Sequence, residues 1–396
     1  MKIIHTSDWH LGQNFFEHSR KEDHESMIGE LAEHVKAEEP DALIIAGDIY
    51  DNVSPNISVQ RELAEYIVRL HDASPSMTIV CISGNHDSAS RHEIYQTPWE
   101  ALNVHMVGKA DLDNLENNLI PIKGKGWIVA IPYTNDRFLT NDFYSSLEQK
   151  VKEVTGEELP IVYVGHAAIK GRDFTGHQTQ NETFIGGIEC TGIEEIGEVY
   201  DYVALGHIHK AQTFDNGRAR YCGSPLPVSF DEVRSGYEHG FSIVEIESHG
   251  STPSIMAVDV ECPRPLINIP SEGHAEWDVA IKELQSLPED IDAFVRLNIL
   301  LKGNELLPHD KDIQVANALK GKKARHATTN PTREVLENQG GNTAIINSMT
   351  MEELQNIDPK SILKSHAAAS GLVFDEEFNE MFDVIFKILN EADHEN

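Results

Sequence analysis

The sequence predicts a layered α/β fold, and three observations support this prediction. Short apolar runs alternate with helical patterns over residues 1–260, which is typical of sheets covered by helices. Polar residues of metal-binding types follow directly after several of the predicted strands. Hydrophobic residues make up 40% of the 396 residues, so a sizeable core is available and wholesale disorder is excluded.

Apolar runs and helical spacing define the expected elements of this first region. The expected strands are Lys2–His5, Asp41–Ala46, Thr78–Ser83, Trp127–Ile131, Ile161–Val164, Tyr200–Leu205 and Gly240–Ile246. One helix is expected around Met27–Val35, ending before Pro40, and a second around Val59–Leu70.

The pattern changes near Cys262, and residues 261–330 predict a small α+β domain. Its expected elements are strands at Leu266–Ile269 and Val295–Leu301, with helices within Ala275–Ser286 and at Ile313–Leu319. Asn330-Pro331 and Gly340-Gly341 predict a linker over residues 331–349. Residues 350–396 predict C-terminal helices, the last with one apolar face that includes Phe378 and Phe382.

The formal charge of −33 makes the chain strongly acidic. A free-standing, non-specific duplex binder would be basic, because affinity for polyanions comes largely from released counterions. If the substrate is nucleic acid, metal ions, a local basic patch or a partner must offset the repulsion. The stretch Lys302–Arg333 carries seven Lys/Arg against three acids and is compatible with DNA contact or with a solvated loop.

The N-terminus has no apolar stretch of signal-peptide length, and no apolar run approaches the ~20 residues of a membrane helix. The four cysteines form no CxxC pair, which argues against structural zinc and against a disulfide framework. A cytoplasmic location is therefore expected.

The residues that carry chemistry sit at the ends of predicted strands. The clusters contain Asp8 and His10, Asp48 and Asp51, Asn85, His86 and Asp87, His166, and His207 with His209. Strand ends at one edge of an α/β sheet form the crevice where ligands bind, so these segments can converge. Glycines before most clusters let the backbone turn sharply or approach closely.

Two carboxylates, one amide and four imidazoles make a mixed N/O ligand set without thiolates: Asp8, His10, Asp48, Asn85, His166, His207 and His209. Such a set suits Mn²⁺, Fe²⁺ or Zn²⁺ better than Ca²⁺ or an all-oxygen Mg²⁺ cage. Seven ligands fit two ions that share a carboxylate, and two such ions can clamp a phosphate and activate water. Outside this set, His5 is expected in the core, and His18, His24, His34, His71 and His92 are expected to be solvated.

The clusters D-x-H, G-D, G-N-H-D, G-H and G-H-x-H, in this order, resemble the calcineurin-like metallophosphoesterase superfamily. Within it, His5–Gly12, Gly84–Ser88, Tyr202–His209 and Tyr221–Glu232 resemble the SbcD family, the nuclease subunits of bacterial SbcCD DNA-repair complexes. The resemblance implies a metallophosphoesterase β-sandwich flanked by helices over residues 1–260, and it is strongest over residues 1–235. It also makes the small domain a DNA-capping domain.

The family pattern implies a role for each matching residue. Around the first metal it places Asp8, His10, Asp48 and His209, and around the second Asp48, Asn85, His166 and His207. His86 would face the scissile phosphate, with Asp87 orienting it. One departure is Asp51, which stands where some relatives carry a second catalytic histidine; it could orient a water or a histidine, or cap a turn.

The resemblance implies two Mn²⁺ ions, with Mg²⁺ or Fe²⁺ as alternatives, and DNA as the substrate. It implies an SbcC-type SMC ATPase as partner, bound by the C-terminal helices, and a homodimer of nuclease subunits in a heterotetramer. The leading hypothesis is a nuclease subunit with exonuclease and single-strand or hairpin endonuclease activity. The alternatives are a small-substrate metallophosphodiesterase or phosphatase, and a non-catalytic scaffold of the ATPase complex.

Overall fold

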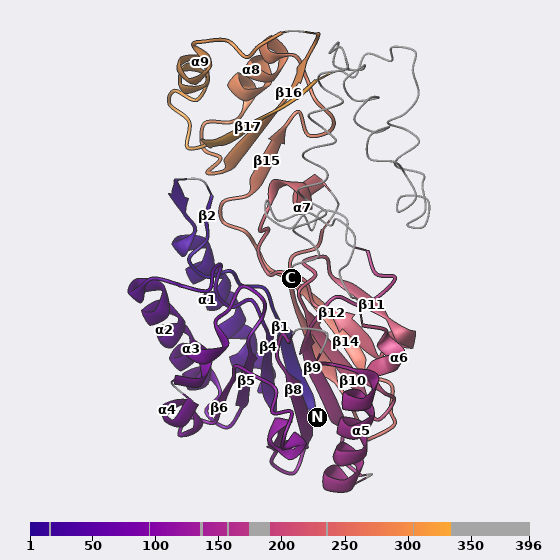
Figure 1. The fold of residues 1–396 in the computed structure, drawn as a ribbon. Helices are drawn as coiled ribbons and strands as arrows, with labels where there is room; N and C mark the ends of the chain where they lie inside the picture. Colours follow the sequence, from indigo (N-terminus) through magenta and orange to yellow (C-terminus); the bar gives the residue numbers. More distant parts are fainter. Residues whose placement is uncertain are drawn as a thin grey trace, which may run out of the picture. The chain divides into compact units, whose positions relative to one another are not determined.

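The computed structural model describes residues 1–15, 17–94, 96–134, 138–156, 158–173, 191–234, 237–303 and 305–333 (Figure 1). The helices expected over residues 350–396 lie outside the described residues, as does most of the expected linker. Within the described part, no helix combines the length and the apolarity that crossing a bilayer requires.

Two six-stranded sheets make up the first region. The first has the order β14-β13-β1-β4-β5-β6, with bounds Ser254–Asp259, Gly240–Glu245, Lys2–Thr6, Ala42–Ala46, Thr78–Ile82 and Val104–Val107. The second has the order β11-β12-β10-β9-β8-β7, with bounds Gln212–Phe214, Ala219–Tyr221, Tyr202–Gly206, Ile161–His166, Gly126–Ile131 and Leu119–Ile122. Strands β1, β4, β5 and β6 are parallel, and so are β8, β9, β10 and β12.

The two sheets pack face to face over a shared apolar core. Ile44 and Val80 of the first sheet contribute to the same buried cluster as Val162 and Ala204 of the second. Because the central strands are covered on both faces, they are almost continuously apolar rather than alternating, as all five residues of β4 are. The fold class predicted from the sequence, a layered sandwich flanked by helices, is confirmed.

Helices cover the outer face of each sheet (Figure 1). On the first sheet lie α1 (Lys21–Glu38) and α2 (Ile57–Ala73), and on the second lie α5 (Asn141–Thr155) and α6 (Ile193–Ile196). Asn56 caps α2 by accepting a hydrogen bond from the Val59 amide at 3.0 Å, which satisfies one free donor of the first turn. The shorter elements are β2 (Asn14–Phe15), β3 (His18–Ser19), α3 (Ala89–Ile94), α4 (Gln96–Glu100), η1 (Leu115–Asn118), η2 (Asp215–Gly217) and α7 (Phe230–Arg234).

A separate small sheet follows in the chain. It has the order β15-β16-β17, all parallel, with bounds Leu266–Ile269, Phe294–Leu301 and Arg325–Arg333. With α8 (Trp277–Ser286) and α9 (Lys311–Ala318) it forms an apolar core of its own. Strand β17 runs through Asn330-Pro331, where the sequence predicts the start of a linker; this prediction is wrong at residues 331–333. An edge strand tolerates proline, because one side of it needs no ladder hydrogen bond.

Candidate metal centre

The predicted clusters lie at the carboxyl ends of five parallel strands. Asp8 and His10 follow β1, Asp48 follows β4, and Asn85 with His86 follows β5. In the second sheet, His166 ends β9, and His207 with His209 follows β10. The adjacency of β1, β4 and β5 in one sheet and of β9 and β10 in the other brings the five loops to one edge.

The backbone at these strand ends is unusual. Asp8, His10, Asp48 and His207 all adopt positive φ, which is uncommon for residues with a Cβ. Hydrogen bonds between neighbouring loops hold this geometry, with the Asp8 amide 2.9 Å from the Gly47 carbonyl and the His10 amide 3.1 Å from the Asp48 carbonyl. Strained backbone of this kind persists only where the surroundings over-determine it, and it concentrates at functional sites.

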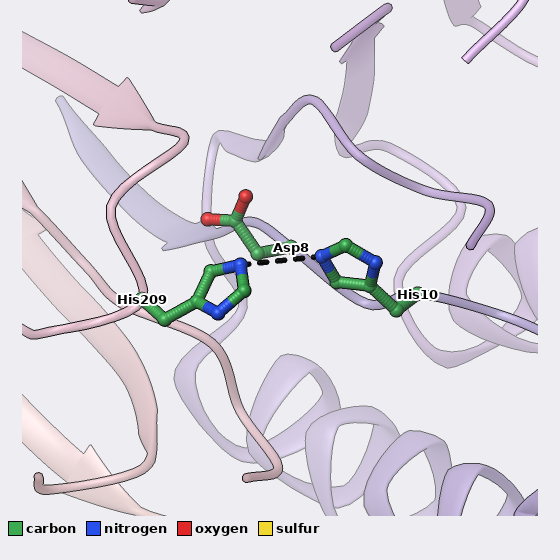
Figure 2. Close-up of side chains that lie close together, drawn as sticks. All are labelled: Asp8, His10 and His209. Carbon is green, nitrogen blue, oxygen red and sulfur yellow. Dashed lines mark hydrogen bonds between the residues drawn. The ribbon is translucent and has the colours of Figure 1, made fainter. Parts of the chain in front are cut away.

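The first ligand group contains Asp8, His10 and His209, all buried, whose ligand atoms lie within 4.8 Å of one another. Figure 2 shows the two imidazoles facing each other beside the Asp8 carboxylate, with 3.3 Å between the Nε2 atoms of His10 and His209. Ser7 donates a 2.5 Å hydrogen bond to Asp8 Oδ2, and the His207 amide donates to Oδ1 at 3.1 Å. The carboxylate is thus held in place before any ligand arrives.

The second ligand group contains Asp48, His166 and His207, also buried. The Asn85 carbonyl oxygen lies 3.0 Å from His166 Nε2 and 3.0 Å from His207 Nδ1, so this amide belongs to the same group. His166 Nδ1 donates to the Ala46 carbonyl at 2.8 Å, which points Nε2 toward Asn85 and Asp48.

Asp48 lies between the two groups. Its Oδ2 is 3.4 Å from His166 Nε2 and 4.0 Å from His10 Nε2, so one carboxylate reaches both sides. Burial disfavours its charge, but the histidines His166, His10 and His86 outweigh burial and hold the Asp48 pKa well below its ordinary value. All seven predicted ligand side chains are therefore close together.

His86 lies beside the first group, with its ring 5.0 Å from that of His10. Its amide donates to Asp48 Oδ1 at 2.8 Å, and its Nδ1 donates to the backbone carbonyl of Asp51 at 2.9 Å. The ring is thus fixed through Nδ1, which leaves Nε2 as its second ring nitrogen.

Asp51, whose role the sequence leaves open, contacts two of these histidines. Its carbonyl accepts from His86, and its carboxylate Oδ1 lies 3.4 Å from His10 Nδ1. Of the three interpretations of Asp51, the geometry agrees with the orientation of a histidine.

Asp87, which is expected to orient His86, binds backbone amides of the two neighbouring loops. The Asp87 carboxylate accepts hydrogen bonds from the backbone amides of Ile49, Tyr50 and Gly84 at 3.1, 2.9 and 2.9 Å. Asp87 therefore ties the loop after β4 to the loop after β5. The sequence did not reveal this because backbone amides carry no signature in residue type.

Two of the histidines expected in solvent, His24 and His92, are buried. Both lie on helices whose inner faces are set by packing, which residue type alone does not indicate. His5 is buried as expected, with Nδ1 2.9 Å from the Tyr202 hydroxyl, and burial lowers its pKa to about 3.

Glu232 is a site residue that the sequence pattern did not single out, although it lies in the family-like stretch Tyr221–Glu232. Glu232 Oε1 lies 2.8 Å from His209 Nδ1, and both side chains are buried. Burial raises the pKa of Glu232 to about 7 and lowers that of His209 to about 3. The one feature of the sequence that could have indicated Glu232 was its carboxylate within that stretch, outside the metal motifs.

A model of the calcineurin-like phosphoesterase family matches residues 1–211, more than half of the chain. The chain is 29% identical over 313 residues to the SbcD subunit of the SbcCD nuclease of Rhodobacter capsulatus, covering 72% of this chain and 76% of that protein. It is 30% identical over 288 residues to the protein of the same name from Bacillus subtilis, covering 67% and 71%. A solved structure described as GAP50, the anchor in the inner membrane complex of Plasmodium, is similar with a TM-score of 0.40 and 12% identity, covering 66% of this chain and 86% of that one.

Proposed function

This chain belongs to the calcineurin-like phosphoesterase family, and on that premise we propose that it is the nuclease subunit of an SbcCD-type complex, a hydrolase that cleaves phosphodiester bonds of DNA. One observation carries the proposal: seven side chains from five loops form two adjoining ligand groups that meet at Asp48. We further propose both exonuclease activity and endonuclease activity on single strands and hairpins.

The donor set fits a pair of divalent transition-metal ions. Two nitrogens bound at ~2.1 Å to one ion lie about 3.0–3.4 Å apart, and the 3.3 Å between His10 and His209 falls in this range. Imidazole, carboxylate and amide donors without thiolate suit Mn²⁺, Fe²⁺ or Zn²⁺. We propose Mn²⁺ because the family resemblance implies it, with Fe²⁺ or Mg²⁺ as alternatives. Asp8, His10, Asp48 and His209 would hold one ion, and Asp48, Asn85, His166 and His207 the other.

Bound ions would supply positive charge that clamps the scissile phosphate and activates water for in-line attack. The protein's own part begins with His86, whose Nδ1 and amide are both engaged, so that Nε2 meets the phosphate in one orientation. There it would stabilise developing charge or protonate the leaving oxygen. Asp87 keeps the loops of Asp48 and His86 in register by binding backbone amides from both.

We propose a homodimer of these subunits with an SbcC-type SMC ATPase, supported by the word "subunit" in the names of the relatives. In this arrangement residues 1–260 form the nuclease domain and 261–330 cap the DNA. Residues 350–396 bind the ATPase beyond a linker that begins after β17, over residues 334–349. A partner and metal ions would offset the −33 charge that opposes contact with DNA. The cytoplasm is the proposed location, supported by three free cysteines in the described part of the chain.

Two substitutions separate metal binding from catalysis. His86→Gln removes the side chain that would face the phosphate, so cleavage of DNA in Mn²⁺ should fall at least ~100-fold while Mn²⁺ binding stays intact. Asp48→Ala removes the shared carboxylate, and both ions should be lost. Oligonucleotide cleavage with and without the ATPase, together with equilibrium dialysis of Mn²⁺, measures both effects.

The matched controls are His71→Gln and Asp72→Ala on α2, which should bind Mn²⁺ and cleave DNA as the wild type does. Full cleavage by His86→Gln would refute its role. Hydrolysis of small phosphodiesters without cleavage of DNA would favour the phosphatase alternative, and binding of the ATPase without any hydrolysis would favour the scaffold.

A further inference from the structure

Glu232 holds His209 from the side opposite the ligand group. Its Oε1 lies 2.8 Å from His209 Nδ1, and its Oε2 accepts a hydrogen bond from the Val228 amide at 2.8 Å. The carboxylate and the imidazole are 1% and 3% exposed, so water does not compete for this contact. Because Nδ1 is engaged, Nε2 of His209 points toward His10, and the ring orientation depends on where Glu232 stands.

Glu232 belongs to the short helix α7, and the two residues before it in this helix, Phe230 and Asp231, contact the small domain. Asn268 of β15 donates to the Phe230 carbonyl at 2.9 Å, and Arg296 of β16 donates to Asp231 Oδ1 at 2.7 Å. The Arg296 guanidinium also lies 5.2 Å from the centre of the Phe230 ring and donates from Nε to Asn268 Oδ1 at 2.8 Å.

These contacts form a small buried polar network. Asn268, Arg296 and Phe230 are all buried, so each hydrogen bond is costly to leave unmade and constrains the position of its partner. Three successive residues of α7 thus connect the small domain with a candidate metal ligand.

We propose that the position of the small domain determines, through α7, how His209 is oriented. Asn268 and Arg296 of the small domain hold α7, and Glu232 of α7 is the positioning residue that holds His209. A partner or DNA that shifts the small domain would then change the affinity of the first ligand group for its metal ion. The inference rests on the proposed function for the two-metal site, but its test measures metal binding rather than cleavage.

The experiment measures Mn²⁺ binding to the purified full-length chain, with free Mn²⁺ followed by its electron paramagnetic resonance signal. Glu232→Gln keeps the size of the side chain and removes its charge, and it should weaken one of two Mn²⁺ sites at least ~10-fold. Arg296→Met should weaken the same site several-fold. The double variant should lose no more than Glu232→Gln alone, because both substitutions act through one chain of contacts.

Two variants serve as matched controls. Glu62→Gln changes a buried glutamate of α2 that pairs with Lys21, and Arg325→Met removes an arginine that pairs with Asp292 within the small domain. Both should leave the two Mn²⁺ affinities unchanged. If Arg296→Met does not fold, Asp231→Asn removes the other partner of the same ion pair, which is the more exposed of the two. This variant should weaken the same Mn²⁺ site to a smaller degree.

The outcomes separate the inference from the proposed function. A wild-type chain that binds fewer than two Mn²⁺ contradicts the proposed function itself. Two intact sites in Arg296→Met and Asp231→Asn, with one weakened in Glu232→Gln, would overturn transmission and leave only local support of His209. Unchanged affinities in Glu232→Gln would overturn the whole inference.

Discussion

Asp48 is the residue at which the two ligand groups meet, and its negative charge helps to raise the pKa of two neighbouring histidines, His10 and His166. Burial disfavours the charged form of His10, but Asp51, Asp48 and Asp8 outweigh burial and raise its pKa to about 9. Burial likewise opposes charge on His166, and Asp48 chiefly raises its pKa to about 9. In the metal-free protein both imidazoles therefore carry protons at neutral pH.

This protonation predicts that Mn²⁺ binding releases protons at pH 7.5. A metal ion binds only the neutral nitrogen, so protons on His10 and His166 must leave when it binds. The apparent Mn²⁺ affinity should rise as the pH increases from 6.5 and level off above about 9. Isothermal titration calorimetry in HEPES and in Tris, which differ in ionisation enthalpy, measures the number of released protons.

The control for this prediction is Asp51→Asn, which removes the carboxylate 3.4 Å from His10 Nδ1. This variant should release fewer protons than the wild type when Mn²⁺ binds. Asp72→Asn, at an exposed position of α2, should release as many protons as the wild type. Identical heats in both buffers for the wild type would contradict the prediction.

At the scale of elements, the loops after β4 and β5 approach each other so closely that only glycine fits. A Cβ on Gly84 would lie 2.1 Å from Asp48 Oδ1 and 2.3 Å from the Asp48 amide nitrogen. A Cβ on Gly47 would lie 2.3 Å from His166 Nδ1. The expectation that these glycines allow close approach to the site is confirmed.

Gly84→Ala should therefore displace Asp48 and weaken Mn²⁺ binding at both sites at least ~10-fold. The matched control is Gly29→Ala in α1, where the new Cβ meets only the end of the flexible Arg69 side chain and helix propensity improves by ~1 kcal/mol. Dialysis against Mn²⁺ and urea unfolding measure the two effects. Wild-type Mn²⁺ affinity in Gly84→Ala would show that the loop can move aside.

At the scale of the whole described molecule, a buried ion network ties the chain leading into the small domain to α1. Asp23 is fully buried and binds Arg20 Nε at 3.0 Å and Arg264 Nε at 2.7 Å. Arg264 also donates to the Ser19 carbonyl at 2.9 Å. Two buried cations thus depend on one carboxylate.

Asp23→Ala should lower the free energy of unfolding by about 3 kcal/mol, because it removes the buried carboxylate that both guanidinium groups contact and leaves Arg264 with only the exposed Glu22. Urea unfolding followed by circular dichroism measures the change. Glu22→Ala is the matched control: its carboxylate is 84% exposed at 3.5 Å from Arg264, and its loss should cost at most ~0.5 kcal/mol. Equal effects of the two substitutions would refute the role assigned to burial.

Prediction from the sequence succeeded where a local pattern carries the information. Buried strands such as β1, β4 and β9 are apolar runs, and α1 and α2 have helical spacing. Edge strand β14 was not predicted: four of its six residues are exposed and none is buried, so its apolar run Ile255–Val258 does not belong to the buried core that the other predicted strands form. The end of β17 escaped because an edge strand accommodates a proline that otherwise indicates a linker.

The sequence by itself determined the layered α/β class and which side chains follow each strand, because apolar periodicity and strand-end residues are local properties. Only the tertiary structure decided that Glu232 contacts His209, that Asp51 contacts His10 and His86, and that Asp87 binds backbone amides. Those contacts join segments far apart in the chain. Strand order and loop geometry determine which residues meet in these contacts, and neither can be deduced from the type of a single residue.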